Sequence, residues 1–220
     1  MDRIKEARLL VKEAGVRMLT SNLVTATWGN ISCRVSGEEL IAITPSGMDY
    51  NELDEEDIVI LDMEGNKVCG DRKPSTEVPM HLYIYRSRKD INAIIHTHST
   101  YATALACAHK PIAPIVEELV QVVGGDVRVA KYALPGTNEL AANVLAAAKD
   151  RNAVLLANHG MIGMAKDMKE AFKICSVVEK GAKITILSNA VGQPVPISFE
   201  DVQIMRENYR KSYGQPVDEN

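Results

Sequence analysis

The chain has 220 residues, of which 46% are hydrophobic and 25% are charged, and its formal net charge is −4. A chain of this length and composition can bury a full core, and we expect one domain that spans residues 1–220. The basic residues are dispersed rather than gathered in a stripe, which is not typical of proteins that bind the nucleic-acid backbone. We therefore expect no nucleic-acid partner.

Neither the apolar residues nor the cysteines indicate a membrane or secreted protein. No apolar stretch reaches 18 residues, and residues 1–6 carry charges of both signs where a leader would place a basic segment before an apolar one. The cysteines lie far apart without a CxxC pair, which argues against a disulfide framework and a thiolate zinc site: Cys33, Cys69, Cys107 and Cys175. We expect a cytoplasmic protein with no membrane partner.

The first third of the chain shows a helix followed by strands that are joined by turns. Asp2 can cap a helix whose apolar residues follow helical spacing and which ends near Asn22. Strands are predicted after the turn-rich segment 25–30, at 31–35, 40–44 and 58–61, with hairpin signals at 36–37 and 63–66. We expect antiparallel pairing to dominate this part of the chain.

From Pro74 onward, helices and strands alternate. The spacing of apolar residues predicts helices at 76–86, 100–108, 138–149 and 168–188. Apolar runs predict strands at 93–97, 127–133 and 154–157. The sequence shows no internal repeat and no low-complexity linker. The pattern predicts an α/β protein with one sheet and helices packed on both of its faces.

Three of the five histidines stand at the ends of strand-like apolar runs. His96 and His98 follow residues 93–95, and because side chains alternate along a strand they point to the same side. Such a pair also occurs by chance or as ordinary hydrogen-bonding residues. His159 follows a second apolar run at 153–156, and strand ends converge at one edge of a sheet. The three histidines together favour a metal site, and imidazole nitrogens suit Zn²⁺.

Glu77 is the candidate for a fourth ligand. It lies in a segment that indicates the start of a helix, with Ser75 as the cap and Pro79 in the first turn. A glutamate at this place also compensates the helix dipole without binding a metal. His81 lies four residues later on the same helical face, so a Glu77–His81 ligand pair stays open as an alternative.

Three short polar clusters have the composition of a phosphate cradle. Each offers backbone N–H groups, hydroxyls or an amide where the chain turns or a helix begins, at Gly29-Asn30, Ser46-Gly47 and Ser75-Thr76. Any one of them alone is more commonly an ordinary turn. Together they make a small phosphorylated substrate a candidate.

Five motifs occur in the order found in the class II aldolase and adducin family, which the chain resembles over nearly its whole length: Gly29-Asn30-Ile31-Ser32, Ile43-Thr44-Pro45-Ser46-Gly47, Pro74-Ser75-Thr76-Glu77, Ile95-His96-Thr97-His98-Ser99 and Asn158-His159-Gly160. The resemblance implies a three-layer α/β/α fold around a central mixed, largely antiparallel sheet. It also implies a homotetramer with zinc sites near the subunit interfaces. The chain is most similar to those members that cleave a ketose 1-phosphate, such as L-fuculose 1-phosphate, to dihydroxyacetone phosphate and an aldehyde.

The resemblance also implies roles for individual residues. Zn²⁺ would be held by four ligands, of which the glutamate is also the acid/base: Glu77, His96, His98 and His159. Phosphate would be held by a second set, Gly29, Asn30, Ser46, Gly47, Ser75 and Thr76. His81 would then support the site rather than bind the metal. Tyr213 lies in a tail segment that would close over the site, with a disordered end as the alternative.

One departure from the family pattern affects the expected reaction. The ketose-phosphate aldolases that the chain resembles carry a tyrosine, thought to protonate the aldehyde oxygen, before a Gly-Gly pair, whereas here residues 116–121 contain none. Glu118 or Glu117 is the candidate substitute, and a surface acidic pair is the alternative. The alternatives within the family are a methylthioribulose-1-phosphate dehydratase, a sugar-phosphate 4-epimerase and a non-enzymatic adducin-like interaction module.

Overall fold

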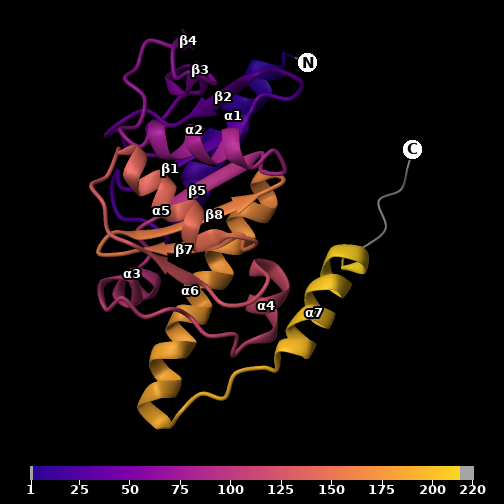
Figure 1. Cartoon of the computed structure of the whole chain (residues 1–220). Helices are drawn as coiled ribbons and strands as arrows, with labels where there is room; N and C mark the ends of the chain where they lie inside the picture. The colour runs from indigo at the N-terminus through magenta and orange to yellow at the C-terminus, as the bar shows by residue number, and fades with distance from the viewer. Residues whose placement is uncertain (1, 214–220) are drawn as a thin grey trace.

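A computed structural model describes residues 2–213 and shows one mixed sheet of eight strands in the order β4-β3-β2-β1-β5-β8-β7-β6 (Figure 1). Every neighbouring pair is antiparallel except β6 and β7, which are parallel. The strands are β1 (Asn30–Arg34), β2 (Leu40–Ile43), β3 (Val59–Asp62), β4 (Lys67–Cys69), β5 (Ala93–Thr97), β6 (Arg128–Ala130), β7 (Ala153–Leu156) and β8 (Gly160–Ala165). The expected largely antiparallel sheet is confirmed.

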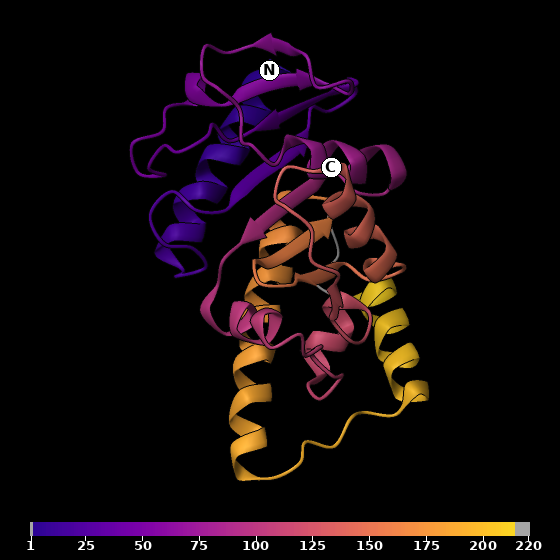
Figure 2. The same ribbon diagram turned by 60° about the vertical axis from the view of Figure 1, so that its left-hand side comes forward.

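Helices cover both faces of this sheet, in three layers (Figure 2). The α-helices are α1 (Arg3–Thr20), α2 (Val78–Ser87), α3 (Thr100–Cys107), α4 (Glu117–Val123), α5 (Asn138–Ala148), α6 (Met168–Val191) and α7 (Phe199–Ser212), and η1 (Glu55–Asp57) is a 3-10 turn. Buried residues of α1, α3, α4 and α6 form one apolar core with one face of the sheet. Buried residues of α2 and α5 form a second core on the other face. The three-layer α/β/α arrangement is therefore confirmed.

The topology brings the ends of three strands, β1, β5 and β7, to one edge of the sheet. Strands β5 and β7 are each antiparallel to β8, so both run in the same direction and their carboxyl ends lie at the same edge. Strand β1 is antiparallel to β5, and its first residue, Asn30, pairs with His96 near the end of β5. Residues that follow β5 and β7 therefore lie beside residues that precede β1.

The structure adds elements that the sequence patterns did not predict. Strand β8 is apolar throughout and contains two glycines, so it shows neither alternation nor strong strand propensity, yet all of its residues are buried between β5 and β7. Helices α4 and α7 were also not predicted. Helix α4 has only seven residues, and α7 is strongly polar with only two buried residues, Val202 and Arg206, so neither shows a long apolar face.

Several predicted boundaries were wrong by a few residues. Helix α2 begins at Val78 with Glu77 as its N-cap, because Ser75 accepts a hydrogen bond from the Glu77 backbone N–H before the helix starts. Strand β6 ends at Ala130 rather than at residue 133. All four cysteines are free, as expected. Among residues 2–213, no helix is long and apolar enough to cross a membrane.

Candidate active site

The three histidines named from the strand ends come together at the edge of the sheet. His96 lies in β5, His98 directly after it, and His159 in the turn between β7 and β8. The three rings pack edge to face with centroids 4.7–4.9 Å apart, and one nitrogen from each lies within 4.8 Å of the others. The predicted convergence of His96, His98 and His159 is therefore seen in the structure.

The surrounding backbone orients these rings. The Nδ1 atom of His96 lies 2.9 Å from the Met161 carbonyl, which can only accept, so Nδ1 carries the proton and Nε2 presents a lone pair to the cluster. Gly160 leaves room for the rings, because a Cβ atom there would lie 2.3 Å from the Thr97 carbonyl oxygen and 3.1 Å from the His98 ring. A larger residue at position 160 would displace the histidines.

The Glu77 carboxylate completes this cluster. Its Oε2 atom lies 2.8 Å from Asn30 Nδ2 and 3.1 Å from His96 Nε2, and its Oε1 atom lies 3.7 Å from His159 Nε2. The side chain is buried, and its residue is the N-cap of α2, where the positive end of the helix dipole stabilises an anion. The carboxylate thus lies beside two of the three histidines, and its role as a fourth ligand stays a prediction.

The electrostatics of the cluster keep its groups in metal-binding forms. Burial, reinforced by the neighbouring histidines, lowers the pKa of His98 to about 3 and that of His159 to about 4, so both rings are neutral at neutral pH. Burial pushes the pKa of Glu77 upward, but the hydrogen bond that Asn30 donates helps to hold it below its usual value. Neutral imidazoles and an ionised carboxylate are the ligand forms that a divalent cation requires.

Two further observations show that these residues fit a cation. The lone pair of His96 Nε2 faces the Glu77 carboxylate and lies 2.9 Å from His98 Nε2, an arrangement of acceptors that a shared positive charge relieves. Glu77 Oε1 and His159 Nδ1 are buried and have no hydrogen-bond partner among residues 2–213. Three imidazoles and one carboxylate are a donor set found in zinc sites, so the cluster could hold a metal ion.

A cavity of about 270 Å³ opens beside the cluster. It is lined by Glu77, His98 and His159 together with all six residues that were predicted to hold phosphate: Gly29, Asn30, Ser46, Gly47, Ser75 and Thr76. Gly29 has a φ of +81°, and a Cβ atom there would lie 2.6 Å from the His96 carbonyl oxygen, so only glycine fits this approach to β5. Three separated turns therefore share one concave surface with the metal cluster.

The cavity also contains residues that the sequence analysis missed: Thr27, Trp28 and Pro135. The Trp28 ring is 63% exposed and stacks on His98, with centroids 5.7 Å apart. The position of Trp28 next to the predicted phosphate-binding pair Gly29-Asn30 was the one sequence feature that could have indicated its place in the cavity. Pro135 lines the cavity because the loop after β6 passes close to Thr76. The approach is so close that a Cβ atom on Gly136 would lie 2.8 Å from the Thr76 carbonyl oxygen. No local pattern indicated that approach.

His81 does not point its nitrogens at the cluster. Its Nε2 atom lies 2.5 Å from Asn30 Oδ1, and its Nδ1 atom lies 2.6 Å from Ser32 Oγ. Because both ring nitrogens are engaged inside the protein, the alternative Glu77–His81 ligand pair does not match the geometry. His81 instead supports Asn30.

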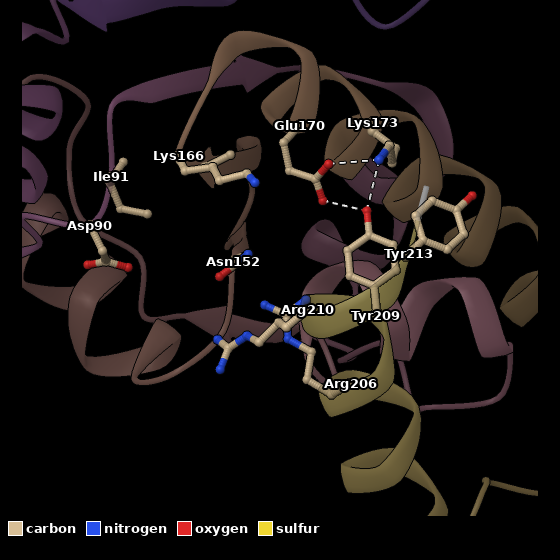
Figure 3. Close-up of a pocket in the computed structure, with 11 residues that line it drawn as sticks. Asp90, Ile91, Asn152, Lys166, Glu170, Lys173, Arg206, Tyr209, Arg210 and Tyr213 are labelled. Atoms are coloured by element: carbon tan, nitrogen blue, oxygen red, sulfur yellow. Dashed lines mark hydrogen bonds and ion pairs between the residues drawn. The ribbon is translucent and has the colours of Figure 1, made fainter. Parts of the chain in front are cut away.

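The remaining candidates lie away from the histidines within one chain. Glu117 and Glu118 begin α4, Glu118 forms an ion pair with Lys180, and neither lines the cavity. Tyr213 packs against Tyr209 at a different cavity of about 360 Å³, where Glu170, Lys173 and Tyr209 are hydrogen-bonded (Figure 3). The resemblance implies a tail that closes over the histidine site, whereas in a single chain Tyr213 lies at this second cavity.

Comparisons with known proteins agree with the fold and the site. The family described as Class II Aldolase and Adducin N-terminal domain matches residues 10–186. A 5-deoxy-D-ribulose 1-phosphate aldolase from Bacillus thuringiensis serovar kurstaki is 40% identical over 201 residues, which cover 91% of this chain and 93% of that protein. A 5-methylthioribulose-1-phosphate/5-deoxyribulose-1-phosphate aldolase from Rhodospirillum rubrum is 38% identical over 203 residues, 92% and 90% of the two chains.

A solved structure of an L-fuculose 1-phosphate aldolase superposes with a TM-score of 0.90 and 43% identity, over 93% of this chain and 96% of the other. The names of all three relatives describe aldolases, which are lyases. The chain therefore belongs to the class II aldolase and adducin family, and it is an enzyme of the aldolase kind.

Proposed function

We propose that this protein is a zinc-dependent aldolase that reversibly cleaves a ketose 1-phosphate to dihydroxyacetone phosphate and an aldehyde. One observation carries the proposal: a single cavity joins the cluster of three histidines and Glu77 to three turns suited to bind a phosphate. The names of the relatives support this substrate class, since each describes an aldolase of a sugar 1-phosphate.

Cleavage of the carbon–carbon bond leaves negative charge on an enediolate. A divalent ion held by His96, His98, His159 and Glu77 would supply the Lewis acid that stabilises this charge. Glu77 is suited to act as the acid/base, because its Oε1 atom has no hydrogen-bond partner among the described residues. In the condensation direction this oxygen would take the proton alpha to the carbonyl.

The phosphate would be held at the wall of the cavity that the three turns form. Ser46, Ser75 and Thr76 offer hydroxyl groups, and Gly47 has a φ of +72° with open space around its Cα, so a phosphate oxygen can approach its backbone. The N-terminus of α2 lies next to this wall and favours a negative charge. Fixing the phosphate aligns the scissile bond with Glu77 and the metal ligands, which raises the rate through positioning.

We also propose that the cytoplasmic enzyme is a homotetramer in which one subunit completes the site of the next. Within one chain, Glu117, Glu118 and Tyr213 lie away from the cavity, so they can act there only from another copy. Helix α6 extends beyond the sheet and the connection 192–198 leads back to α7 (Figure 2), and this part exposes Leu187, Val191, Val195 and Phe199. Such an exposed apolar surface fits a subunit contact.

The alternatives make different predictions from the same site. A methylthioribulose-1-phosphate dehydratase would use the same metal cluster with Glu117 or Glu118 and would release no dihydroxyacetone phosphate. A sugar-phosphate 4-epimerase is disfavoured by Glu77, since the epimerases of the family carry aspartate at that place. An adducin-like interaction module would lack the metal ligands, whereas in this chain His96, His98 and His159 converge and could hold a metal ion.

The test is to incubate the purified, zinc-loaded protein with a panel of ketose 1-phosphates and to detect dihydroxyacetone phosphate with a coupled dehydrogenase. The panel includes 5-deoxyribulose, L-fuculose and methylthioribulose 1-phosphates, and mass spectrometry detects loss of water. We expect cleavage of at least one substrate. Dehydration without cleavage would establish the dehydratase, and absence of both turnover and bound metal would establish the interaction module.

A further inference from the structure

A line of buried polar side chains runs from Glu77 into the layer between β1 and α2. Three of its members, Glu77, His81 and Tyr85, are spaced by four residues from the N-cap of α2 almost to its end, and so share one helical face. The other two, Asn30 and Ser32, are two residues apart and share the face of β1 that meets this helix. All five are at most 5% exposed. Of these five residues, only Glu77 is a proposed metal ligand.

Consecutive members of this line are within hydrogen-bond distance. Asn30 Nδ2 lies 2.8 Å from Glu77 Oε2, and Asn30 Oδ1 lies 2.5 Å from His81 Nε2. His81 Nδ1 lies 2.6 Å from Ser32 Oγ, which lies 2.8 Å from the Tyr85 hydroxyl. The line therefore connects the carboxylate of the site to the interior of the protein without a gap.

The direction of each hydrogen bond follows from the chemistry of its ends. The ionised Glu77 carboxylate only accepts, so the Asn30 amide must turn its NH₂ group toward it and its oxygen toward His81. His81 must then donate from Nε2, which leaves Nδ1 as an acceptor for the Ser32 hydroxyl. The Ser32 oxygen in turn accepts from Tyr85. All four hydrogen bonds point toward Glu77.

The surroundings keep His81 in the neutral form that this direction needs. Burial lowers the pKa of His81 to about 3, because a charged ring would lose its hydration in the interior. The far end of the line is also fixed, since Arg34 Nη2 donates to the Tyr85 carbonyl oxygen at 2.5 Å and its guanidinium lies 4.9 Å from the Tyr85 ring centre.

We propose that His81, Ser32 and Tyr85 are positioning residues that fix the orientation of the Asn30 amide and thereby give the two oxygens of Glu77 different roles. Oε2 is held by the Asn30 donor, and Oε1, which has no hydrogen-bond partner among the described residues, is left for the reacting proton. The assignment of Oε1 to the reacting proton rests on the proposed function. The orientation of the Asn30 amide and the tautomer of His81 are independent of the proposed function.

The importance of the hydrogen-bond direction is clear when every hydrogen bond in the line is reversed. If the His81 ring carried its proton on Nδ1, Nε2 would become an acceptor and the Asn30 amide would have to turn over. The Asn30 oxygen would then face the Glu77 carboxylate at hydrogen-bond distance, and two acceptors repel each other. In the arrangement proposed, this repulsion is absent, the Ser32 hydroxyl donates to Nδ1, and the Tyr85 hydroxyl donates to the Ser32 oxygen.

The direct test is nuclear magnetic resonance of metal-free protein labelled with ¹⁵N-histidine at pH 7. The His81 signals are identified by their loss in His81→Gln. We expect Nε2 to carry the proton and Nδ1 to show the shift of an unprotonated ring nitrogen that accepts a hydrogen bond. A proton on Nδ1, or a doubly protonated ring, would overturn the proposal. This measurement needs neither substrate nor metal, so its outcome is independent of whether the protein cleaves ketose phosphates.

The functional test compares Ser32→Ala with Tyr85→Phe and with a matched control, Thr185→Val. Thr185 also has a buried hydroxyl, but it donates to Gly181 within α6, away from the cavity. Ser32→Ala removes the donor to His81, and we expect kcat to fall roughly tenfold with little change in KM, the effect of one lost buried hydrogen bond. Tyr85→Phe removes only the last donor and should lower kcat by less.

Zinc affinity, measured by competition with a chelator dye, gives a readout without turnover. We expect Ser32→Ala to bind zinc roughly tenfold more weakly and to show a mixture of His81 tautomers, since partners that orient a ligand affect affinity by this order. Thr185→Val should match the wild type in both. If Ser32→Ala and Tyr85→Phe lower thermal stability but leave the His81 tautomer, zinc affinity and kcat unchanged, the line is only structural. If Ser32→Ala does not fold, the kinetics of Tyr85→Phe and the His81 tautomer measured in the wild type still test the proposal.

Discussion

The edge of the sheet that carries the histidines differs from the surface around α4 and α7. At the sheet edge, Glu77, His96 and their neighbours are buried, hydrogen-bonded and already assembled within one chain. Around α4 and α7, Glu118 is ion-paired with Lys180 at the surface and Tyr213 is 66% exposed. The comparison teaches that one chain by itself assembles the histidine cluster and the turns proposed to bind phosphate, whereas Glu118 and Tyr213 could reach this site only from another copy of the chain, as the proposed tetramer requires.

The largest effect is expected at the metal cluster. His98→Ala removes one of three converging imidazoles, so we expect loss of bound zinc and of measurable turnover. Elemental analysis of the purified variant measures the metal directly. His109→Ala is the matched control, because His109 is an exposed histidine that bonds Asn158 and lies outside the cluster. Full zinc occupancy in His98→Ala would remove this residue from the ligand set.

Glu77→Gln tests the chemistry of the same region with less change in structure. The amide keeps the shape of the side chain but takes up a proton poorly, so we expect exchange of the donor-carbon proton to fall by roughly 10²–10⁴. Mass spectrometry of dihydroxyacetone phosphate incubated with the enzyme in D₂O measures this exchange. Exchange at the wild-type rate in a zinc-loaded variant would refute the role of Glu77 as the base.

A mixing experiment tests whether the two regions meet between subunits. We expect Glu118→Gln to retain zinc but to lose cleavage by roughly 10² or more, as for loss of an acid/base group. When Glu118→Gln is unfolded and refolded together with His98→Ala, mixed tetramers should regain activity, because some sites then combine an intact cluster with an intact Glu118. Glu117→Gln, tested in the same way, shows which of the two glutamates has this role. Near-normal activity of Glu118→Gln would assign this residue to the surface.

The smallest expected effect concerns the pH dependence of stability. The pKa of His81 is about 3 in the folded state against an ordinary value of 6.5, so the unfolded chain takes up a proton that the folded chain excludes. The free energy of unfolding of the metal-free protein should therefore fall as the pH falls below about 6.5, by about 2 kcal/mol from His81 alone between pH 7 and 5.

Urea denaturation at the two pH values measures this difference, and His81→Gln should show a smaller one. His98 and His159 add to the effect in the same direction, since their pKa values are lowered too. An unchanged free energy of unfolding across this range would mean that His81 is charged or hydrated in the folded protein.

The sequence by itself determined which residues could form the centre of the site. His96 and His98 follow an apolar strand run, and His159 follows another, so alternation along strands and the meeting of strand ends were enough to bring them together. The turns that supply Gly29, Ser46 and Ser75 were visible because their residue types favour turns and helix starts. Alternation along a strand and turn preference are local rules, whereas the meeting of the two strand ends depends on strand β8 between them.

Only the tertiary structure decided how those residues are used. Strand β8 was hidden because burial between two strands leaves no alternation, and α7 was hidden because it buries only Val202 and Arg206. His81 changed from a possible ligand to a partner of Asn30, and Pro135 entered the cavity, through contacts between residues more than 50 positions apart. Such contacts depend on the packing of α2 against β1 and on the approach of the β6–α5 loop to Thr76, which no short stretch of sequence encodes.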